Sequence, residues 1–294
     1  MRLVFSIILT LCFLPSYALA STQKIGPDLY AYISENDASA NSTFLVSEKG
    51  ILVVDTGLNA QEGRKLLEEI RKVSQAPVRW IVNTHYHPDH RGGNSVVGPD
   101  AVVISTAYTR IKAAASPDYA LNETVSSQPV ILYVGGHRAE VYQPLTLYVG
   151  AHRVEIYHPG PAHTLGDLIV YFPDDHALST GDLFLNNSCP AMDEGDMENW
   201  IRALDHMLAL PVEHIVPGHF ELASKAQMQA FRNYLVDLRD QVASMRQHGV
   251  PLAQVQSRLK LDAYKGFRQY PHYDATFKEN AAAYYGQLQK RAGK

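Results

Sequence analysis

The residues of this chain best suited to chemistry are five histidines and two aspartates that recur in short motifs between residues 85 and 219. Imidazole and carboxylate are ligands that zinc prefers, and other first-row metals accept them as well. The densest motif has the pattern H-x-H-x-D-H, and three shorter motifs follow it, each with one further His or Asp. The candidate ligands are His85, His87, Asp89, His90, His163, Asp182 and His219.

The spacing of the first motif indicates that its residues divide between two metal ions. A strand expected over 78–82 ends just before the motif, and in extended backbone residues i and i+2 point to the same side. His85 and His87 can therefore bind one ion together. Pro88 disfavours the helical region for His87, which keeps this short stretch extended.

The chain is then expected to turn or to form a short helix, which points the next side chains elsewhere. Asp89 and His90 can thus reach a second ion close to the first. His163 would complete the first site, and His219 would complete the second. Asp182 can bridge both ions, so the sequence predicts a dinuclear centre.

These motifs, in this order, resemble those of the metallo-β-lactamase superfamily. Members of that family also carry Asp-Thr-Gly after an early strand, and this chain has Asp55-Thr56-Gly57 after Leu52-Val53-Val54. The resemblance extends from about residue 28 to residue 219. It implies an α+β fold, a four-layer αββα sandwich with the metals at one edge between two sheets.

The resemblance also implies a role for each candidate residue. One metal takes three histidines, the other takes an aspartate and two histidines, and a further aspartate is shared. Asp55 would lie behind the ligands and fix their loop. The expected sets are His85, His87 and His163 for the first metal and Asp89, His90 and His219 for the second, with Asp182 shared.

Asp182 bears on the substrate, because the best-known lactamases of this superfamily carry a Cys, or a Ser with altered ligands, at its position. A bridging Asp is instead typical of hydroxyacylglutathione hydrolases, lactonases and many members of broad specificity. Shared fold and metal ligands say little about substrate. The resemblance therefore gives no reason to expect lactamase activity in particular.

We expect an exported hydrolase with two zinc ions that cleaves a small ester, lactone or β-lactam-like cyclic amide with a metal-bound hydroxide. Asp89 is the candidate catalytic residue, because it can both bind metal and accept a proton from the attacking water. The partner would be a small-molecule substrate, and iron or manganese could replace zinc. Two alternatives stay open, a mono-iron dioxygenase of the same superfamily and a zinc-binding protein without catalysis.

Residues 1–20 have the features of a secretory signal peptide. Arg2 supplies the positive start, residues 3–14 form an apolar run too short to cross a membrane, and Ala18-Leu19-Ala20 is a cleavage motif. We expect a mature chain that starts at Ser21 and keeps no membrane anchor. It would be secreted, into the periplasm if the source is a Gram-negative bacterium.

Composition limits the remaining choices. Residues 21–294 suffice for one large domain, and we expect a single domain with helices from about residue 223 onward. The net charge is −4 and no Lys/Arg-rich run is present, which argues against nucleic acid as a partner.

Only Cys189 remains after cleavage, so no intramolecular disulfide can form. It is expected to be a small buried residue, because no activating base is readable beside it.

Hydrophobic patterns predict the elements that position the ligands. A fifteen-residue repeat, with units at 132–144 and 147–159, predicts two hairpins. A helix is expected over 60–73, and helices are expected again over 223–247 and beyond. Strands are expected over 29–33, 42–46, 51–54, 78–82, 101–104, 168–172, 177–180 and 212–216.

Export can be tested on protein isolated from the native host. Because the cleavage motif ends at Ala20, N-terminal sequencing of the exported protein should begin at Ser21. Recovery of an intact Met1 form from the cytosol would contradict the prediction.

Overall fold

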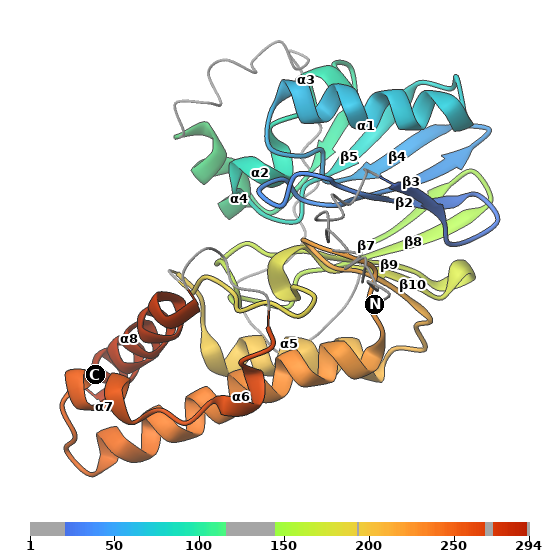
Figure 1. Ribbon diagram of the computed structural model, residues 1–294. Helices are drawn as coiled ribbons and strands as arrows, with labels where there is room; N and C mark the ends of the chain where they lie inside the picture. Colours follow the sequence, from blue (N-terminus) through green and yellow to red (C-terminus); the bar gives the residue numbers. More distant parts are fainter. Residues whose placement is uncertain (1–20, 116–144, 193, 268–272, 293–294) are drawn as a thin grey trace, which may run out of the picture.

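Two β-sheets packed face to face form the centre of the protein, as the computed structural model shows (Figure 1). The structure describes residues 21–115, 145–192, 194–267 and 273–292. The predicted signal peptide, residues 1–20, and the first repeat unit, residues 132–144, lie outside the described residues.

The first sheet has six strands that lie in chain order, β1 to β6. Strands β1 to β4 pair antiparallel, and β5 and β6 are added in parallel. The strands are β1 (Ser21–Lys24), β2 (Leu29–Ile33), β3 (Ser42–Ser47), β4 (Gly50–Val54), β5 (Val78–Val82) and β6 (Val102–Ile104).

The second sheet has five strands in the order β11-β10-β9-β8-β7. Strands β10 and β11 are parallel, and the other pairs are antiparallel. Strands β7 and β8 form a hairpin, so the prediction for the second repeat unit is confirmed. The strands are β7 (Leu145–Val149), β8 (His152–Tyr157), β9 (Ile169–Phe172), β10 (Ala177–Ser179) and β11 (His214–Val216).

Helices cover the outer face of each sheet, so the expected four-layer αββα sandwich is confirmed (Figure 1). Helices α1 (Ala60–Val73) and α3 (Asn94–Val97) cover the first sheet. Helices α5 (Met197–Ala209) and α6 (Lys225–Gln247) cover the second. The other α-helices of the described residues are α2 (Pro88–Arg91), α4 (Ala107–Ala114), α7 (Leu252–Arg258) and α8 (Tyr273–Ala292).

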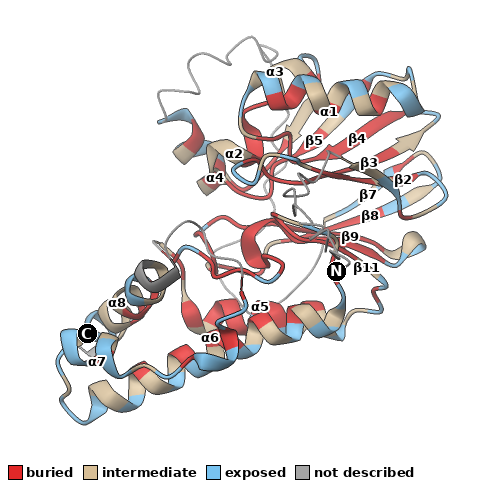
Figure 2. Cartoon of the chain, in the orientation of Figure 1, coloured by how far each residue is buried: buried red, intermediate tan, exposed pale blue. Residues whose placement is uncertain are grey.

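Three hydrophobic clusters fill the spaces between the four layers. Strand β4 contributes side chains to two of these clusters, one on each face of the first sheet. Side chains of a strand point alternately to opposite faces. Ile51 and Val53 therefore pack under α1, while Leu52 and Val54 face the second sheet. Both faces of β4 are thus buried, as the run of red along the inner strands shows (Figure 2).

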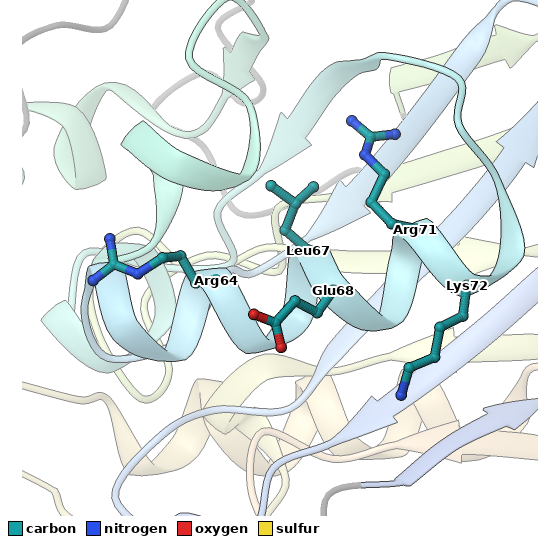
Figure 3. Close-up of a pocket in the computed structure, with 5 residues that line it drawn as sticks. All are labelled: Arg64, Leu67, Glu68, Arg71 and Lys72. Atoms are coloured by element: carbon teal, nitrogen blue, oxygen red, sulfur yellow. The ribbon is translucent and has the colours of Figure 1, made fainter.

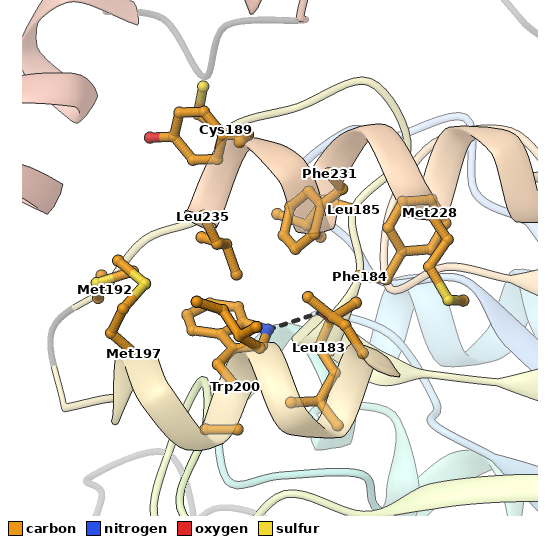
Figure 4. Close-up of a cluster of buried hydrophobic side chains, with 14 of the residues drawn as sticks. Leu183, Phe184, Leu185, Cys189, Met192, Met197, Trp200, Met228, Phe231 and Leu235 are labelled. Carbon is orange, nitrogen blue, oxygen red and sulfur yellow. Dashed lines mark hydrogen bonds between the residues drawn. The ribbon is translucent and has the colours of Figure 1, made fainter. Parts of the chain in front are cut away.

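The third cluster lies between the second sheet and helices α5, α6 and α8, and Trp200 is at its centre (Figure 4). The Trp200 indole N–H donates a hydrogen bond of 2.9 Å to the carbonyl oxygen of Leu183, drawn as a dashed line in Figure 4. The same ring lies 5.4 Å from the ring of His163. Trp200 of α5 therefore contacts both His163 and Leu183, the residue after Asp182. Packing of α5 thus helps to hold the two segments that carry these candidate ligands.

The Trp200 hydrogen bond can be tested with Trp200→Phe, which keeps an aromatic ring but removes the donor. The buried Leu183 carbonyl then loses its partner, which costs about 1–3 kcal/mol. Differential scanning calorimetry should show a fall in Tm of about 2–4 °C per kcal/mol lost. Trp80→Phe is the matched control, because Trp80 is the only other tryptophan and is only partly buried. Equal effects of the two substitutions would contradict the prediction.

Candidate metal centre

The candidate ligands come together at one edge of the sandwich, where strands of both sheets end. His85, Asp182 and His219 each lie three residues beyond the end of a strand, namely β5, β10 and β11. Asp89 and His90 lie on α2, which is the short helix expected after His87. Within each of two groups, all the ligand atoms lie within 4.8 Å of one another. The groups are His85, His87, His163 and Asp182, and Asp89, His90, Asp182 and His219.

The first group has the dimensions of a tetrahedral metal site. A tetrahedral zinc ion with bonds of about 2.0–2.1 Å separates its ligand atoms by roughly 3.3 Å. His87 Nδ1 lies 3.0 Å from His85 Nε2 and 3.3 Å from His163 Nε2. Asp182 Oδ2 lies 3.6 Å from His163 Nε2 and 4.0 Å from His85 Nε2. The four atoms therefore surround a point that a small cation fits.

The second group is arranged in the same way around the other oxygen of Asp182. Asp182 Oδ1 lies 3.1 Å from His90 Nε2 and 3.6 Å from His219 Nε2. Asp89 Oδ2 lies 3.1 Å from His219 Nε2 and 3.3 Å from His90 Nε2. Asp182 thus presents one carboxylate oxygen to each group.

Two atoms of the second group indicate that a cation belongs there. His90 Nε2 and Asp182 Oδ1 are buried and make no hydrogen bond with any residue that the structure describes, although they lie 3.1 Å apart. Buried polar atoms nearly always have a partner, and those without one need an explanation. A metal ion bound to both atoms would satisfy them, so the residues present fit a metal.

Four of the five histidines make a hydrogen bond with the ring nitrogen that points away from the two ligand groups. These bonds fix which nitrogen is presented to a metal. A ring that donates its Nδ1–H to an oxygen is held in the tautomer that leaves Nε2 unprotonated for a metal. His87 is the exception, since its Nδ1 faces the first group. The pairs are His85 with the Thr84 hydroxyl (3.1 Å), His90 with Asp55 Oδ2 (2.7 Å), His163 with the Ala191 carbonyl (3.2 Å) and His219 with the Asp37 carbonyl (3.0 Å).

Asp55 lies behind the ligand loop and is almost fully buried. Its Oδ1 accepts a hydrogen bond of 2.8 Å from the Thr84 backbone N–H. Its Oδ2 accepts bonds of 2.7 Å from both the Thr84 hydroxyl and His90 Nδ1. Asp55 has φ of 55°, a left-handed conformation that Asp tolerates better than most residues. One carboxylate therefore fixes the start of the loop and the orientation of His90.

The histidines of the first group are in the form that binds metal. Burial, together with the positive charge of nearby histidines, holds the pKa of His85 well below its usual value. Burial lowers the pKa of His87 and brings the pKa of His163 to about 4. Neutral imidazole is the ligand form, so this group needs to release no proton from its histidines at neutral pH.

The second group behaves differently, because its carboxylates lie against its histidines. Burial lowers the pKa of His90, but Asp182, Asp89 and Asp55 outweigh it and hold that pKa well above the usual value. The pKa of His219 is also raised, against burial, by Asp182 and Asp89. Burial raises the pKa of Asp89 and Asp182, but their histidine neighbours hold both well below the usual range. The carboxylates of this group thus favour a proton on its histidines, and the histidines favour ionised carboxylates.

The loop between β2 and β3 is a part of the centre that sequence reasoning missed. Three backbone groups of this loop contact the ligand turns of the second group. The N–H of Ala40 donates to the Asp89 carbonyl (3.1 Å), the N–H of Asn41 donates to the Gly218 carbonyl (2.8 Å), and the Asp37 carbonyl accepts from His219. No motif marks the loop in the sequence, because it acts mainly through its backbone.

A second group of residues that the sequence did not reveal lies beside His87. The Lys112 ammonium is 2.8 Å from Glu194 Oε1, and the Tyr108 hydroxyl donates to Glu194 Oε2 (2.7 Å). Lys112 also lies over the rings of Tyr86 and Tyr108, and the Tyr86 ring contacts the His87 ring. These residues tie α4 to the 194–196 segment next to the first ligand group. Their separation in sequence, more than 80 residues from Lys112 to Glu194, hid the cluster.

Cys189 is buried in the third hydrophobic cluster, as expected, and is not a member of either ligand group (Figure 4). Burial raises the pKa of its thiol to about 12. A thiol that stays protonated at neutral pH is a poor nucleophile.

A shallow depression elsewhere, on α1, is lined by Arg64, Leu67, Glu68, Arg71 and Lys72 and contains none of the candidate ligands (Figure 3).

Three known proteins are similar to this chain over different shares of their length. A linear primary-alkylsulfatase from Pseudomonas sp. is 49% identical over 45 residues, which cover 15% of this chain and 8% of that protein. A hydroxyacylglutathione hydrolase from Hyphomonas neptunium is 29% identical over 202 residues, 64% of this chain and 65% of that protein. The solved sec-alkylsulfatase Pisa1 from Pseudomonas sp. is similar in fold, with a TM-score of 0.70, 16% identity, and coverage of 92% of this chain and 50% of that one.

The chain thus spans less than two thirds of the length of each of these three relatives. A sequence model of the metallo-beta-lactamase superfamily matches residues 36–219, which is more than half of the chain and contains every candidate ligand. The chain therefore belongs to the metallo-beta-lactamase superfamily.

Proposed function

We propose that this protein is an exported dinuclear zinc hydrolase that cleaves a small ester, lactone or cyclic amide. One observation supports the dinuclear centre above all, namely that the two oxygens of Asp182 face two separate ligand groups. Two groups that share a carboxylate are typical of sites at which two ions act on one substrate.

When bound, the two zinc ions would supply an activated water and polarise the bond to be cleaved. Asp89 is the carboxylate placed to handle the proton. Its side chain is 23% exposed, against 10% for Asp182, so water and substrate reach Asp89 more easily. Its Oδ2 is held by His219 Nε2 at 3.1 Å. Asp89 is therefore ionised, oriented and accessible, which suits a group that binds metal and accepts a proton.

The bridging aspartate and the likeness to a hydroxyacylglutathione hydrolase support ester or thioester cleavage. A second candidate is hydrolysis of an alkyl sulfate ester, favoured by the 45-residue match to a linear primary-alkylsulfatase. A screen of zinc-loaded protein on aryl esters, acyl lactones, β-lactams, a glutathione thioester and an alkyl sulfate separates the two. Turnover of alkyl sulfate alone would replace the first candidate by the second.

Two other functions make different predictions for the metal. A mono-iron dioxygenase of the same superfamily would hold one iron per chain and consume oxygen. A zinc-binding protein without catalysis would hold zinc but would turn over none of the screened substrates. Metal analysis of protein from the native host, combined with the substrate screen, distinguishes both from a dinuclear zinc hydrolase.

Export is part of the proposal and is supported by the signal features of residues 1–20. Among the described residues, no helix combines the length and the apolar character needed to span a bilayer.

Metal loading should depend on pH differently at the two groups. Since their carboxylate neighbours raise the pKa values of His90 and His219, zinc must compete with protons at these two residues, and its affinity should fall as the pH is lowered, by up to about tenfold per pH unit for each proton displaced. The first group, with histidines of lowered pKa, should lose little affinity. Calorimetric titration should give two zinc ions per chain at pH 7.5 and a selectively weakened second ion at pH 6.0. Equal weakening of both ions would contradict the prediction.

Turnover should depend on Asp89 and not on Cys189. Asp89→Asn keeps the size of the side chain but removes its charge and most of its basicity, so kcat should fall by about 10²–10⁴-fold. Cys189→Ala should leave kcat nearly unchanged, because the buried thiol takes no part. Both are measured on the best substrate of the screen, with zinc content determined for each variant. Loss of activity in Cys189→Ala alone would indicate a thiol mechanism.

A further inference from the structure

His87 differs from the other four candidate histidines in how its ring is held. Its Nδ1 faces the first ligand group, 3.0 Å from His85 Nε2 and 3.3 Å from His163 Nε2. The other four rings each make a hydrogen bond through their outer nitrogen, but Nε2 of His87 has no such partner among the described residues. Metal-binding histidines are normally oriented through that outer nitrogen. The orientation of the His87 ring therefore depends on contacts of another kind.

The ring of Tyr86 supplies such a contact. Its centre is 4.6 Å from the centre of the His87 ring, and the two planes meet at 73°, which is an edge-to-face arrangement. The rings of His85 and His163 pack against His87 in the same way, but both belong to the ligand group itself. Among the described residues, Tyr86 is thus the aromatic neighbour of His87 that is not a candidate ligand.

Glu194 holds the ring of Tyr86 through two residues of α4. The Lys112 ammonium lies 5.6 Å from the centre of the Tyr86 ring, close enough for a cation–π attraction, and 2.8 Å from Glu194 Oε1. The Tyr108 ring packs edge-to-face on Tyr86, and its hydroxyl donates to Glu194 Oε2 (2.7 Å). Burial and the Glu194 carboxylate raise the pKa of Tyr86 to about 12. Both oxygens of this carboxylate thus hold side chains that contact Tyr86.

The segment that carries Glu194 is fixed next to another ligand of the same group. The backbone N–H of Asp196 donates to the carbonyl oxygen of Ala162 (2.9 Å), the residue before His163. A Cβ atom on Gly195 would lie 2.2 Å from that oxygen, so glycine permits this close approach. Glu194 therefore extends from a backbone tied to one ligand and holds the ring that packs on another.

We propose that Glu194 is a positioning residue of the metal centre. It fixes Lys112 and Tyr108 against the ring of Tyr86, and that ring orients His87 toward the first metal ion. The inference rests on the metal centre of the proposed function and adds a support that the ligand motifs do not contain. The side chains of Glu194 and Lys112 are 26% and 41% exposed, and exposed ion pairs contribute little to stability. Removing Glu194 should therefore change the metal site more than the fold.

The first test measures the affinities of the two zinc ions by competition with a chelator. Glu194→Ala removes the carboxylate and should weaken one of the two ions about tenfold, as loss of a residue that orients a ligand does. Glu194→Gln keeps an oxygen that can accept from Tyr108 but loses the charge that holds Lys112, so its effect should be smaller. Wild-type affinity for both ions in Glu194→Ala would overturn the proposal.

Variants of Tyr86 test whether Glu194 acts through this ring. Tyr86→Phe keeps the ring and should bind zinc more tightly than Tyr86→Leu, which lacks it. Tyr86→Leu should lose about as much affinity as Glu194→Ala, and the double variant should lose no more than either single one. Losses that multiply in the double variant would show that the two residues act independently, which contradicts the proposal.

NMR of the cadmium-substituted protein identifies the ion that is affected, because each bound ion gives its own resonance. His163→Ala and His219→Ala assign the two resonances, since each variant removes a ligand of one group. Glu194→Ala should shift or broaden the resonance of the first group. An effect on the second group alone, or an equal effect on both, would contradict the proposed path through His87.

Asp205→Ala is the matched control for a loss of stability. Asp205 forms a partly exposed ion pair with Arg232 (2.8 Å) that joins α5 to α6, in the outer layer of the sandwich (Figure 1). Calorimetric Tm values of Asp205→Ala and Glu194→Ala should both lie close to that of the wild type, whereas zinc affinity should change in Glu194→Ala alone. A fall in Tm of Glu194→Ala with unchanged zinc affinity would show a purely structural role.

A measurement on the metal-free protein separates failure of this inference from failure of the proposed function. Nuclear Overhauser effects between the rings of Tyr86 and His87 should be present in the wild type, weaker in Glu194→Ala and unchanged in Asp205→Ala. If they depend on Glu194 but the wild type binds fewer than two zinc ions, the positioning role stands and the dinuclear proposal falls. If the wild type binds two zinc ions and neither these effects nor zinc affinity depend on Glu194, the dinuclear centre stands and this inference falls.

Discussion

The arrangement of this edge of the protein depends on one shared carboxylate. Asp182 is buried, ionised and placed between two sets of imidazole nitrogens, with a different oxygen facing each set. A buried charge is unfavourable unless other charges or hydrogen bonds compensate it. The raised pKa values of His90 and His219 show that the carboxylates favour positive charge on these two rings, which contributes to that compensation. Bound metal ions would take over the same role, which is why metal binding and proton release are coupled here.

The surrounding structure is built to keep that carboxylate in place. A Cβ atom on Gly218 would lie 2.0 Å from Asp182 Oδ1, so only glycine fits at that position. Trp200 holds the carbonyl of Leu183, the residue after Asp182, and α5 carries Trp200 into the third hydrophobic cluster. The fold therefore contributes by bringing the ends of β5, β10 and β11 together. Local packing and hydrogen bonds then orient the side chains, as a metal centre requires.

Much of this could be predicted from the sequence. The bounds of β2, α1 and β5 follow directly from hydrophobic periodicity, because these elements bury one clear face or lie fully inside. The seven candidate ligands were recognisable because their types and order are rare by chance. What escaped prediction depends on contacts between distant segments. Asn41 clamps the turn at 217–220, Glu194 meets Lys112, and Asn280 of α8 donates to the Pro190 carbonyl. Polar residues of these types are common in loops and helices, so their roles become visible only in three dimensions.

The central claim is that two metal ions share Asp182, and anomalous scattering from crystals of the zinc-loaded protein tests it most directly. Data collected on both sides of the zinc absorption edge should give two difference peaks. One should be surrounded by His85, His87 and His163 and the other by Asp89, His90 and His219, with an oxygen of Asp182 at each. A single peak, or a second peak without contact to Asp182, would contradict the account.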